Sequence, residues 1–128
     1  MPQHLGAATI IVRDYDEAIA FYVGKMGFTL FEDTPIGDKR WVMVGPKGGQ
    51  TRLLLARAAS PREGAAIGTQ FAGRVGFFLH TDNFARDHAA YLAAGVKFHE
   101  APRFEPYGTV AVFEDLYGNE WDLIEPKT

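Results

Sequence analysis

Three side chains with useful chemistry stand in apolar, strand-like runs of the sequence. His80 ends the run VGFFLH, Asp122 lies inside NEWDLIE, and Arg52 opens RLLLAR. A histidine titrates near neutral pH and suits proton transfer, whereas a planar guanidinium pairs with a carboxylate or phosphate through two parallel hydrogen bonds. Asp122, flanked by Trp121 and Leu123, needs a partner if it is buried. His80 and Asp122 are therefore candidates for acid–base catalysis, and Arg52 for ligand binding.

Each of these residues also has a structural explanation. A histidine on a strand is more often hydrogen-bonded structure than a catalyst. Arg52 could carry a surface charge at a strand edge, or it could form an internal ion pair with Asp122. Tyr107, between Pro106 and Gly108, could cover the mouth of a pocket, but turn formation alone accounts for it. The sequence leaves these alternatives open.

The composition restricts the chemistry further. The 128 residues include no cysteine, which excludes disulfides, thiolate-bound zinc and cysteine nucleophiles. The net charge is −3 and the 13 lysines and arginines are scattered, so no basic stripe predicts nucleic-acid binding. No apolar run approaches the roughly 20 residues that cross a bilayer, and the N-terminus lacks a signal-peptide pattern. We therefore expect a cytoplasmic protein without membrane or nucleic-acid partners.

The elements that must position these residues begin with a strand and a helix. Residues 7–13 form an apolar, β-branched run, and Asp14 then opens a segment with apolar residues at helical spacing. Asp14 followed by Glu17 fits a capping box. Gly27 suits the left-handed residue that ends a helix, and residues 28–31 begin another strand.

The second half of the chain repeats this order. Residues 75–80 predict a strand, Asp82 a helix N-cap, and Gly95 a helix end. A common offset of 68 residues separates Asp14 from Asp82 and Gly27 from Gly95 (82 − 14 and 95 − 27). The apolar residues expected to share one face of the second helix are Ala85, Ala89, Leu92 and Ala93. Two tandem βαβββ units account for this duplication.

The remaining strands and the boundaries follow from the turn residues between them. The further strands are expected over residues 27–34, 39–44, 51–57, 96–100, 108–114 and 120–125. We expect one domain over residues 1–128, with unit 1 at about 4–57, a linker at 58–73 and unit 2 at about 74–126. Within the linker, Ser60-Pro61-Arg62-Glu63 predicts a short helical turn.

Two segments resemble a known family. VRDYDEAIAFYVGKMGF is similar to the opening strand and helix of the glyoxalase/bleomycin-resistance/dioxygenase superfamily, also called vicinal oxygen chelate proteins. VFEDLYGNEWDLIEP is similar to its closing turn and strand, and the resemblance covers essentially the whole chain. It implies an α+β fold in which tandem βαβββ units enclose a cavity. It also implies a homodimer, in which units pair within one chain or are swapped between two chains.

The resemblance also indicates where a metal would bind. In metal-dependent members, four ligands, usually His, Gln or Glu, point into the cavity from four strands. The equivalent positions here are Ala7, Leu54, Gly76 and Asp122. Three of them have no donor atom in the side chain, and a single carboxylate is not a site. We therefore expect no cofactor, with a divalent metal at a non-standard site as the disfavoured alternative.

Strand alternation then gives the rest of the cavity lining. If the ligand-equivalent positions face inward, the lining is mostly apolar and consists of Thr9, Ile11, Arg52, Leu54, Ala56, Phe78, His80, Asp122 and Ile124. Val75, Phe77 and Leu79 would pack beneath the second helix. From the polar and aromatic members we predict ligand-binding residues at Thr9, Arg52, Phe78, His80, Tyr107 and Asp122. The orientations of Arg52, Trp41 and Tyr107 are left open.

Three functions are compatible with these features. The leading hypothesis is metal-independent binding of a drug or metabolite, because an apolar lining replaces the metal ligands. The alternative is a lyase, isomerase or dioxygenase of the same superfamily, with a non-standard metal site or with metal-free acid–base chemistry by His80 or Asp122. A purely structural or partner-binding module is the least favoured, since the sequence offers no long apolar helix face and no charged tail.

Overall fold

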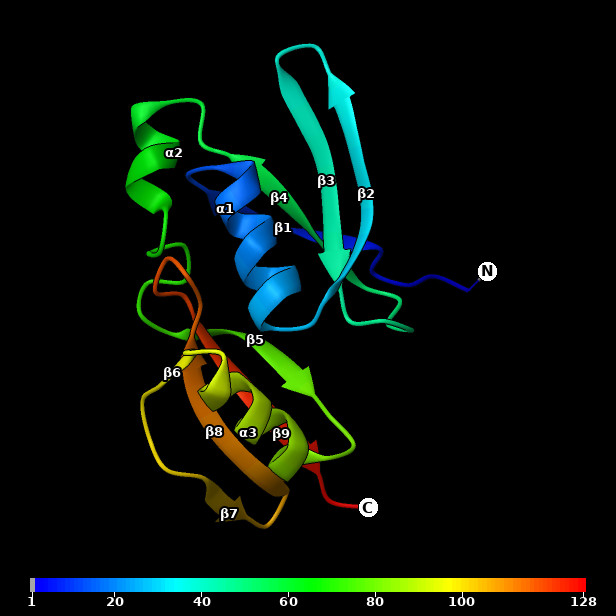
Figure 1. Cartoon of the computed structure of the whole chain (residues 1–128), viewed down its shortest axis with the longest axis vertical. Coiled ribbons are helices and arrows are strands. Elements are labelled where there is room, and N and C mark those ends of the chain that lie inside the picture. Colours follow the sequence, from blue (N-terminus) through cyan, green and yellow to red (C-terminus); the bar gives the residue numbers. More distant parts are fainter. Residues whose placement is uncertain (1) are drawn as a thin grey trace. The chain divides into compact units, whose positions relative to one another are not determined.

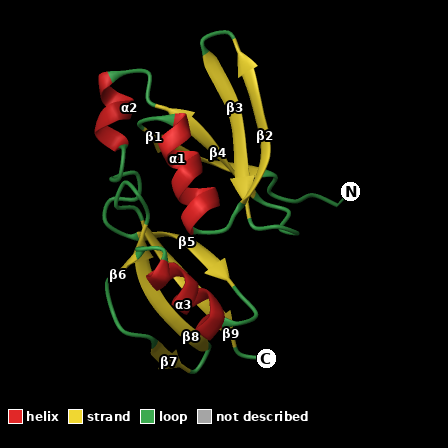
Figure 2. Cartoon of the chain, in the orientation of Figure 1, coloured by secondary structure: helices red, strands yellow, loops and turns green. Residues whose placement is uncertain are grey.

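The computed structural model describes residues 2–128 and divides the chain at Gln70 into two units. Unit 1 spans Met1–Gln70 and unit 2 spans Phe71–Thr128, so the expected linker falls almost entirely within unit 1. Each unit consists of a mixed β-sheet with a helix against one face (Figures 1 and 2). This is the tandem α+β arrangement that the sequence predicts.

Unit 1 contains a four-stranded sheet in the order β1-β4-β3-β2, in which only the β1–β4 pair is parallel. Its elements are β1 (Ala7–Val12), α1 (Tyr15–Ile19), the π-helical turn η1 (Ala20–Lys25), β2 (Thr29–Ile36), β3 (Lys39–Gly45), β4 (Arg52–Arg57) and α2 (Pro61–Ala66). The β2 strand begins and ends two residues later than predicted, because Pro35 and Ile36 continue the pairing with β3.

The helix boundaries of unit 1 follow the predicted caps. Asp14 accepts a hydrogen bond from the Glu17 backbone N–H at 2.9 Å, and Gly27 has a φ of 74°, a conformation that side chains disfavour. In the segment after β4, the Ser60 hydroxyl accepts from the Glu63 N–H at 3.1 Å while the Glu63 carboxylate accepts from the Ala59 N–H at 3.0 Å. This reciprocal pair begins α2 and confirms the predicted helical turn.

Strand register fixes which residues of unit 1 share a face. Ile10 lies opposite Leu55 and both are fully buried, on the face covered by α1. Thr9 lies opposite Leu54, on the other face. We call the sheet face turned away from α1, or from α3 in unit 2, the distal face.

A side chain protects the open edge of the sheet of unit 1. β1 is an edge strand, and edge strands expose backbone groups that can pair with other chains. The Gln70 amide accepts from the Ile11 N–H at 3.0 Å and donates to the Thr9 carbonyl at 2.8 Å. Gln70 therefore hydrogen-bonds to β1 as a neighbouring strand would, and it ties the end of unit 1 to its first strand.

Unit 2 has a five-stranded sheet in the order β5-β9-β8-β6, with β7 also paired to β8. Its elements are β5 (Val75–His80), α3 (Phe84–Ala93), β6 (Lys97–Phe98), β7 (Arg103–Glu105), β8 (Gly108–Glu114) and β9 (Glu120–Pro126). The short β7 strand was not predicted, and β6 is shorter than expected. Gly95 ends the helix region with a φ of 87°, as the repeat with Gly27 predicts.

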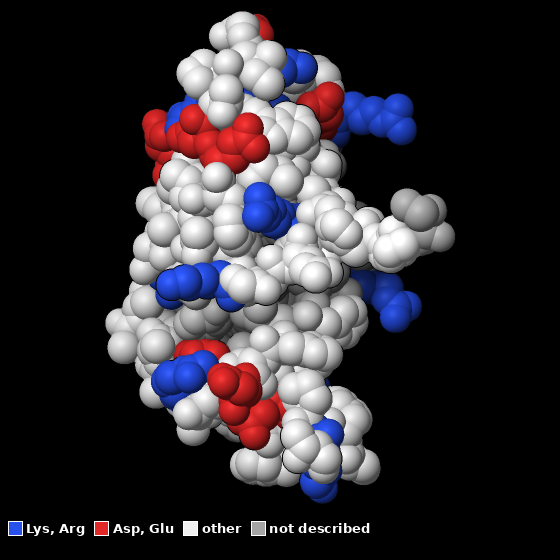
Figure 3. All heavy atoms as spheres, turned by 90° about the vertical axis from the view of Figure 1, so that its right-hand side faces the viewer, with Lys and Arg blue, Asp and Glu red and all other residues white. Residues whose placement is uncertain are grey.

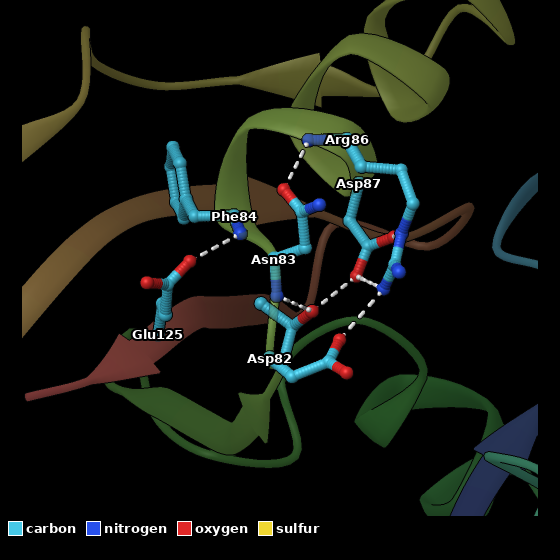
Figure 4. Close-up of polar contacts among 7 residues, drawn as sticks. Asp82, Asn83, Phe84, Arg86, Asp87 and Glu125 are labelled. Atoms are coloured by element: carbon cyan, nitrogen blue, oxygen red, sulfur yellow. Dashed lines mark hydrogen bonds and ion pairs between the residues drawn. The ribbon is translucent and has the colours of Figure 1, made fainter. Parts of the chain in front are cut away.

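The N-terminus of α3 corrects one prediction (Figure 4). The N-cap is Asn83, whose side chain accepts from the Arg86 N–H at 3.1 Å, and not Asp82. The Asp82 carboxylate instead pairs with the Arg86 guanidinium at 3.0 Å, and Arg86 also contacts Asp87 at 2.9 Å. Asp82 and Asn83 are both residue types that cap helices. Because the helix begins after Asn83, the Asp82 side chain is available for an ion pair with Arg86, four residues further along.

The buried face of α3 also differs from the alanine-rich face expected from the sequence. Leu92 is 51% exposed, and Ala85, Ala89 and Ala93 are exposed as well. The buried residues are Phe84 and Tyr91, which occur at a spacing of seven. Large aromatic side chains bury more apolar area than alanines, so they orient the helix.

A β-bulge interrupts β5. The register shifts between Val75 and Phe77, so that Val75 lies opposite Glu120 and Phe77 opposite Trp121. Gly76 is the extra residue, and a Cβ atom there would collide with the ring of Phe71. The simple alternation expected for β5 therefore holds only from Phe77 onward.

Within residues 2–128, no helix is long and apolar enough to cross a membrane.

Candidate functional site

The predicted site residues of unit 1 lie together on its distal face. Thr9 is opposite Leu54 and Ala7 is opposite Arg52 in the parallel pair β1–β4. In the neighbouring pair β3–β4, Met43 is opposite Leu54, so its side chain lies on the distal face as well. Leu54, a metal-ligand position in the resemblance, is half-buried between two apolar or weakly polar neighbours.

Arg52 stacks on an aromatic ring. Its guanidinium carbon lies 3.9 Å from the centroid of Phe31, the residue at the irregularity in β2. Among residues 2–128, no carboxylate forms an ion pair with Arg52. Stacking fixes the guanidinium plane without using its N–H groups, so Arg52 keeps donors for a ligand.

A pocket of about 380 Å³ opens at one end of the sheet of unit 1, between the β2–β3 hairpin, the end of β4 and the segment that leads into α2. Its apolar walls are Tyr15, Ile36, Trp41, Leu54, Leu55, Ala56 and Ala59. Trp41 precedes Met43 by two residues, which places it on the distal face, and it is 40% exposed. This volume and lining are typical of a small-molecule site.

The rim of this pocket carries charged residues, namely Lys39, Arg40, Arg57 and Glu63. Tyr15 lies between two of them, with guanidinium carbons 5.1 Å (Arg40) and 5.2 Å (Arg57) from its ring centroid. Arg40 is neutralised by Asp33 at 2.7 Å and Asp16 at 2.9 Å, and the Arg40 guanidinium lowers the pKa of Asp33.

The predicted site residues of unit 2 lie on two elements and one turn. Phe78 is opposite Asp122 and His80 is opposite Ile124 in the β5–β9 pair, on the distal face. Phe78 is 62% exposed. Tyr107 lies in the turn between β7 and β8 and is 53% exposed. The structure therefore brings Phe78 and Asp122 together within unit 2, as it brings Thr9 and Leu54 together within unit 1.

The surroundings of the Asp122 carboxyl group raise its pKa. Burial is the largest cause that raises its pKa; nearby Arg103 lowers it, and Glu100 and Glu120 raise it further. Its buried Oδ1 atom has no hydrogen-bond partner among residues 2–128. A buried acceptor without a donor costs free energy, so burial shifts the equilibrium of this carboxyl group toward its neutral form relative to an exposed aspartate.

We predict that Asp122→Asn stabilises the protein at neutral pH. Because the folded-state pKa of Asp122 is raised, stability from this group is fully present below the unfolded pKa, near 3.8, and is lost as pH rises through the folded pKa. The variant should therefore melt at a higher temperature than the parent chain at pH 7, and the difference should shrink toward zero at pH 3 to 4. A difference independent of pH would contradict this assignment.

The residues at the four ligand-equivalent positions do not fit a divalent cation. Ala7, Leu54 and Gly76 offer no donor atom, and the ring of Phe71 occupies the space that a side chain at position 76 would need. No group of three or more His, Cys, Asp or Glu residues within 2–128 is arranged to hold a metal ion. Asp122 therefore remains a single carboxylate at these positions.

Asp115 is a buried carboxylate with several hydrogen bonds, and it was not among the predicted site residues. Asp115 is 4% exposed and begins the turn between β8 and β9. Its two oxygens accept hydrogen bonds from the Tyr117 and Asn119 backbone N–H groups, both at 3.0 Å, and from the Trp121 indole at 3.1 Å and the Asn119 amide at 3.2 Å. Asp115 therefore holds the turn that starts β9 and so positions Asp122.

Most residues of the pocket in unit 1 were also not predicted from the sequence. Leu54 and Ala56 were predicted to line a cavity and the orientation of Trp41 was left open, but Tyr15 and Arg57 were not predicted. Strand alternation places Arg57 with the residues covered by α1, and only its place at the end of β4 lets it reach the pocket rim. The sequence feature that could have indicated the pocket rim is the presence of basic residues beside expected turns, at Lys39, Arg40 and Arg57.

Charges elsewhere are distributed in small mixed groups. In the view of Figure 3, the basic side chains of each unit form separate patches, some beside acidic side chains and some apart from them, and not one continuous basic area. A nucleic-acid interface would need such an area.

The comparisons with known proteins agree with the geometry. The family model for the Glyoxalase/Bleomycin resistance protein/Dioxygenase superfamily matches residues 4–123. An uncharacterised protein of Shewanella frigidimarina (strain NCIMB 400) is 52% identical over 98% of this chain and 95% of its own length.

Two solved structures are similar over nearly the whole chain. UcmS2 is 33% identical, with a TM-score of 0.85 over 98% of this chain and 99% of its own. TnmS3, an antibiotic binding protein from Streptomyces sp. CB03234, is 31% identical, with a TM-score of 0.80 over 98% of both chains.

Proposed function

Because the chain belongs to the glyoxalase/bleomycin resistance protein/dioxygenase superfamily, we propose that it binds a small molecule, a drug or metabolite, without a metal ion. The observation that carries this proposal is the pocket of about 380 Å³ in unit 1, which includes Leu54 in its lining. Where a metal-dependent relative would present a ligand, this chain presents an apolar wall. The similarity to TnmS3, an antibiotic binding protein, supports the same class of function.

The chemistry of the pocket favours flat apolar ligands. The exposed Trp41 ring offers a surface for stacking, and Ile36 and Leu54 offer aliphatic contact. Arg52, stacked on Phe31 on the same sheet face, can donate to a polar group of a larger ligand.

The test is a thermal-shift screen of antibiotics and aromatic metabolites against the parent chain and a variant with a filled pocket. Ala59→Trp fills the pocket from an exposed position, and Ala65→Trp on the exposed side of α2 is the matched control. A ligand should raise the melting temperature of the parent chain and of the control, but not that of Ala59→Trp. A ligand that stabilises all three proteins equally would show that binding occurs elsewhere.

A second candidate function rests on Asp122. A carboxyl group with a raised pKa can act as a general acid or base, and His80 lies on the adjacent strand of the same face. This favours a metal-free lyase or isomerase of the same superfamily. Once a substrate is found, Asp122→Asn should reduce turnover by about a hundredfold or more, and unchanged turnover would remove this candidate.

A further inference from the structure

The rim of the pocket in unit 1 carries two basic residues, Lys39 and Arg57, that could pair with a ligand. The Lys39 backbone pairs with Ile36 in the β2–β3 hairpin, but among residues 2–128 neither its ammonium group nor the Arg57 guanidinium has a carboxylate partner. The Arg40 guanidinium, by contrast, is bound by Asp16 and Asp33. The one acidic residue of the rim, Glu63, accepts the Ala59 N–H at the start of α2. The formal charges of Lys39, Arg40 and Arg57 and those of Glu63, Asp16 and Asp33 therefore balance, and the cations that remain available to a ligand are Lys39 and Arg57.

Arg57 is held in a position suited to ligand recognition. Its guanidinium lies over the ring of Tyr15 at 5.2 Å, and one terminal nitrogen donates to the Asp38 carbonyl at 2.9 Å. Of the five N–H donors of an arginine, one is used here and stacking uses none. A guanidinium that is held by one hydrogen bond and by stacking, with further N–H donors available, loses little entropy when it pairs with an anion.

From these contacts we propose that the pocket selects aromatic organic anions: a flat ring system that packs against Trp41 and Leu54, with a carboxylate or sulfonate paired to Arg57 and, less closely, to Lys39. This inference rests on the proposed function, because it names the ligand class of the same pocket. The paired charge lies at the rim, where water partly screens it, so the expected gain in affinity is about tenfold rather than several orders of magnitude.

Two dyes with the same aromatic skeleton test this proposal. 1-Anilinonaphthalene-8-sulfonate carries a sulfonate, whereas N-phenyl-1-naphthylamine is its neutral counterpart. In fluorescence titrations at low ionic strength, the parent chain should bind the sulfonate about tenfold more tightly than the neutral dye. Raising the salt concentration to 0.5 M should narrow this difference.

Charge-removing variants identify the residues responsible. Arg57→Gln should weaken binding of the sulfonate five- to tenfold and leave the affinity for the neutral dye within about twofold. Lys39→Gln replaces an exposed side chain that forms no ion pair among residues 2–128, and it should weaken sulfonate binding about twofold. It provides a second test if Arg57→Gln disturbs Tyr15. Arg62→Gln removes a charge from exposed α2 outside the pocket and should change neither affinity.

The outcomes separate this inference from the proposed function. Equal affinity for the two dyes, or an equal loss of both in Arg57→Gln, would overturn the anion selectivity while leaving the pocket as a binding site. An effect of Arg62→Gln as large as that of Arg57→Gln would also overturn it, since loss of any positive charge would then weaken sulfonate binding wherever that charge lies. If the filled-pocket variant Ala59→Trp binds both dyes as well as the parent chain does, the proposed function itself fails.

Discussion

Replacing Trp41 with alanine is expected to weaken the binding of an aromatic ligand by about thirtyfold, or about 2 kcal/mol, the size of a typical aromatic hot spot. Trp41 is 40% exposed and is the largest side chain of the pocket wall. Its removal deletes the stacking surface while Leu54 and Tyr15 remain. Titration of the neutral dye N-phenyl-1-naphthylamine, which has no charge to pair with Arg57, measures this contribution directly.

A matched control distinguishes stacking from general loss of apolar surface. Phe104 in β7 is 84% exposed and does not line this pocket, so Phe104→Ala should leave the affinity within about twofold. Because Trp41 is partly exposed, Trp41→Ala should unfold at nearly the urea concentration of the parent chain. Equal affinities of Trp41→Ala and the parent chain would remove Trp41 from the site.

Replacing Asp115 with alanine should cost about 4 kcal/mol of unfolding free energy, a large fraction of the 5–15 kcal/mol that ordinarily stabilises a domain. The substitution leaves the backbone N–H groups of Tyr117 and Asn119 and the Trp121 indole without their acceptor. Urea unfolding followed by circular dichroism measures the loss.

Two further variants calibrate the effect of Asp115. Asp115→Asn keeps one acceptor oxygen but turns an amide toward donors such as the Trp121 indole, so it should fall between the parent chain and alanine. Asp82→Ala removes an aspartate whose side chain is 88% exposed and which pairs only with Arg86, and it should cost under about 1 kcal/mol. If Asp115→Ala is no more costly than Asp82→Ala, the buried network has no stabilising role.

The fold could be predicted from the sequence because local signals repeat. Asp14 caps α1, and Gly27 and Gly95 both adopt the left-handed conformation that a helix end requires. These features depend on neighbouring residues only, so the residue types determine them. The prediction of Asp82 as the N-cap of α3 was wrong, because the neighbouring Asn83 is an equally good cap. The ion pair between Asp82 and Arg86 favours the helix start at Asn83.

The pocket could be predicted only in part. Alternation placed Thr9 and Leu54 on one face, and the register of β1 and β4 agrees. The orientation of Trp41 depends on how β3 pairs with β4, and the contribution of Tyr15 depends on packing between the helix start and the end of β4. Such long-range contacts leave no periodic pattern in the sequence.

The same limit explains the errors in unit 2. The alanine-rich face of α3 has helical spacing, but the aromatic residues Phe84 and Tyr91 determine which face is buried. The bulge at Gly76 follows from the position of Phe71, which an alternation pattern cannot reveal. Predicted ligand residues on this face, among them His80 and Asp122, therefore remain predictions until a ligand is bound.

We propose above all that the pocket of unit 1 binds a small aromatic molecule without a metal ion. Its most direct test is a titration of N-phenyl-1-naphthylamine into protein stripped with EDTA, repeated after addition of Zn²⁺, Mn²⁺ or Fe²⁺. We expect dissociation constants that agree within about twofold in all four samples, each weakened about thirtyfold by Trp41→Ala. Binding that disappears on chelation and returns with one of the metals would contradict it.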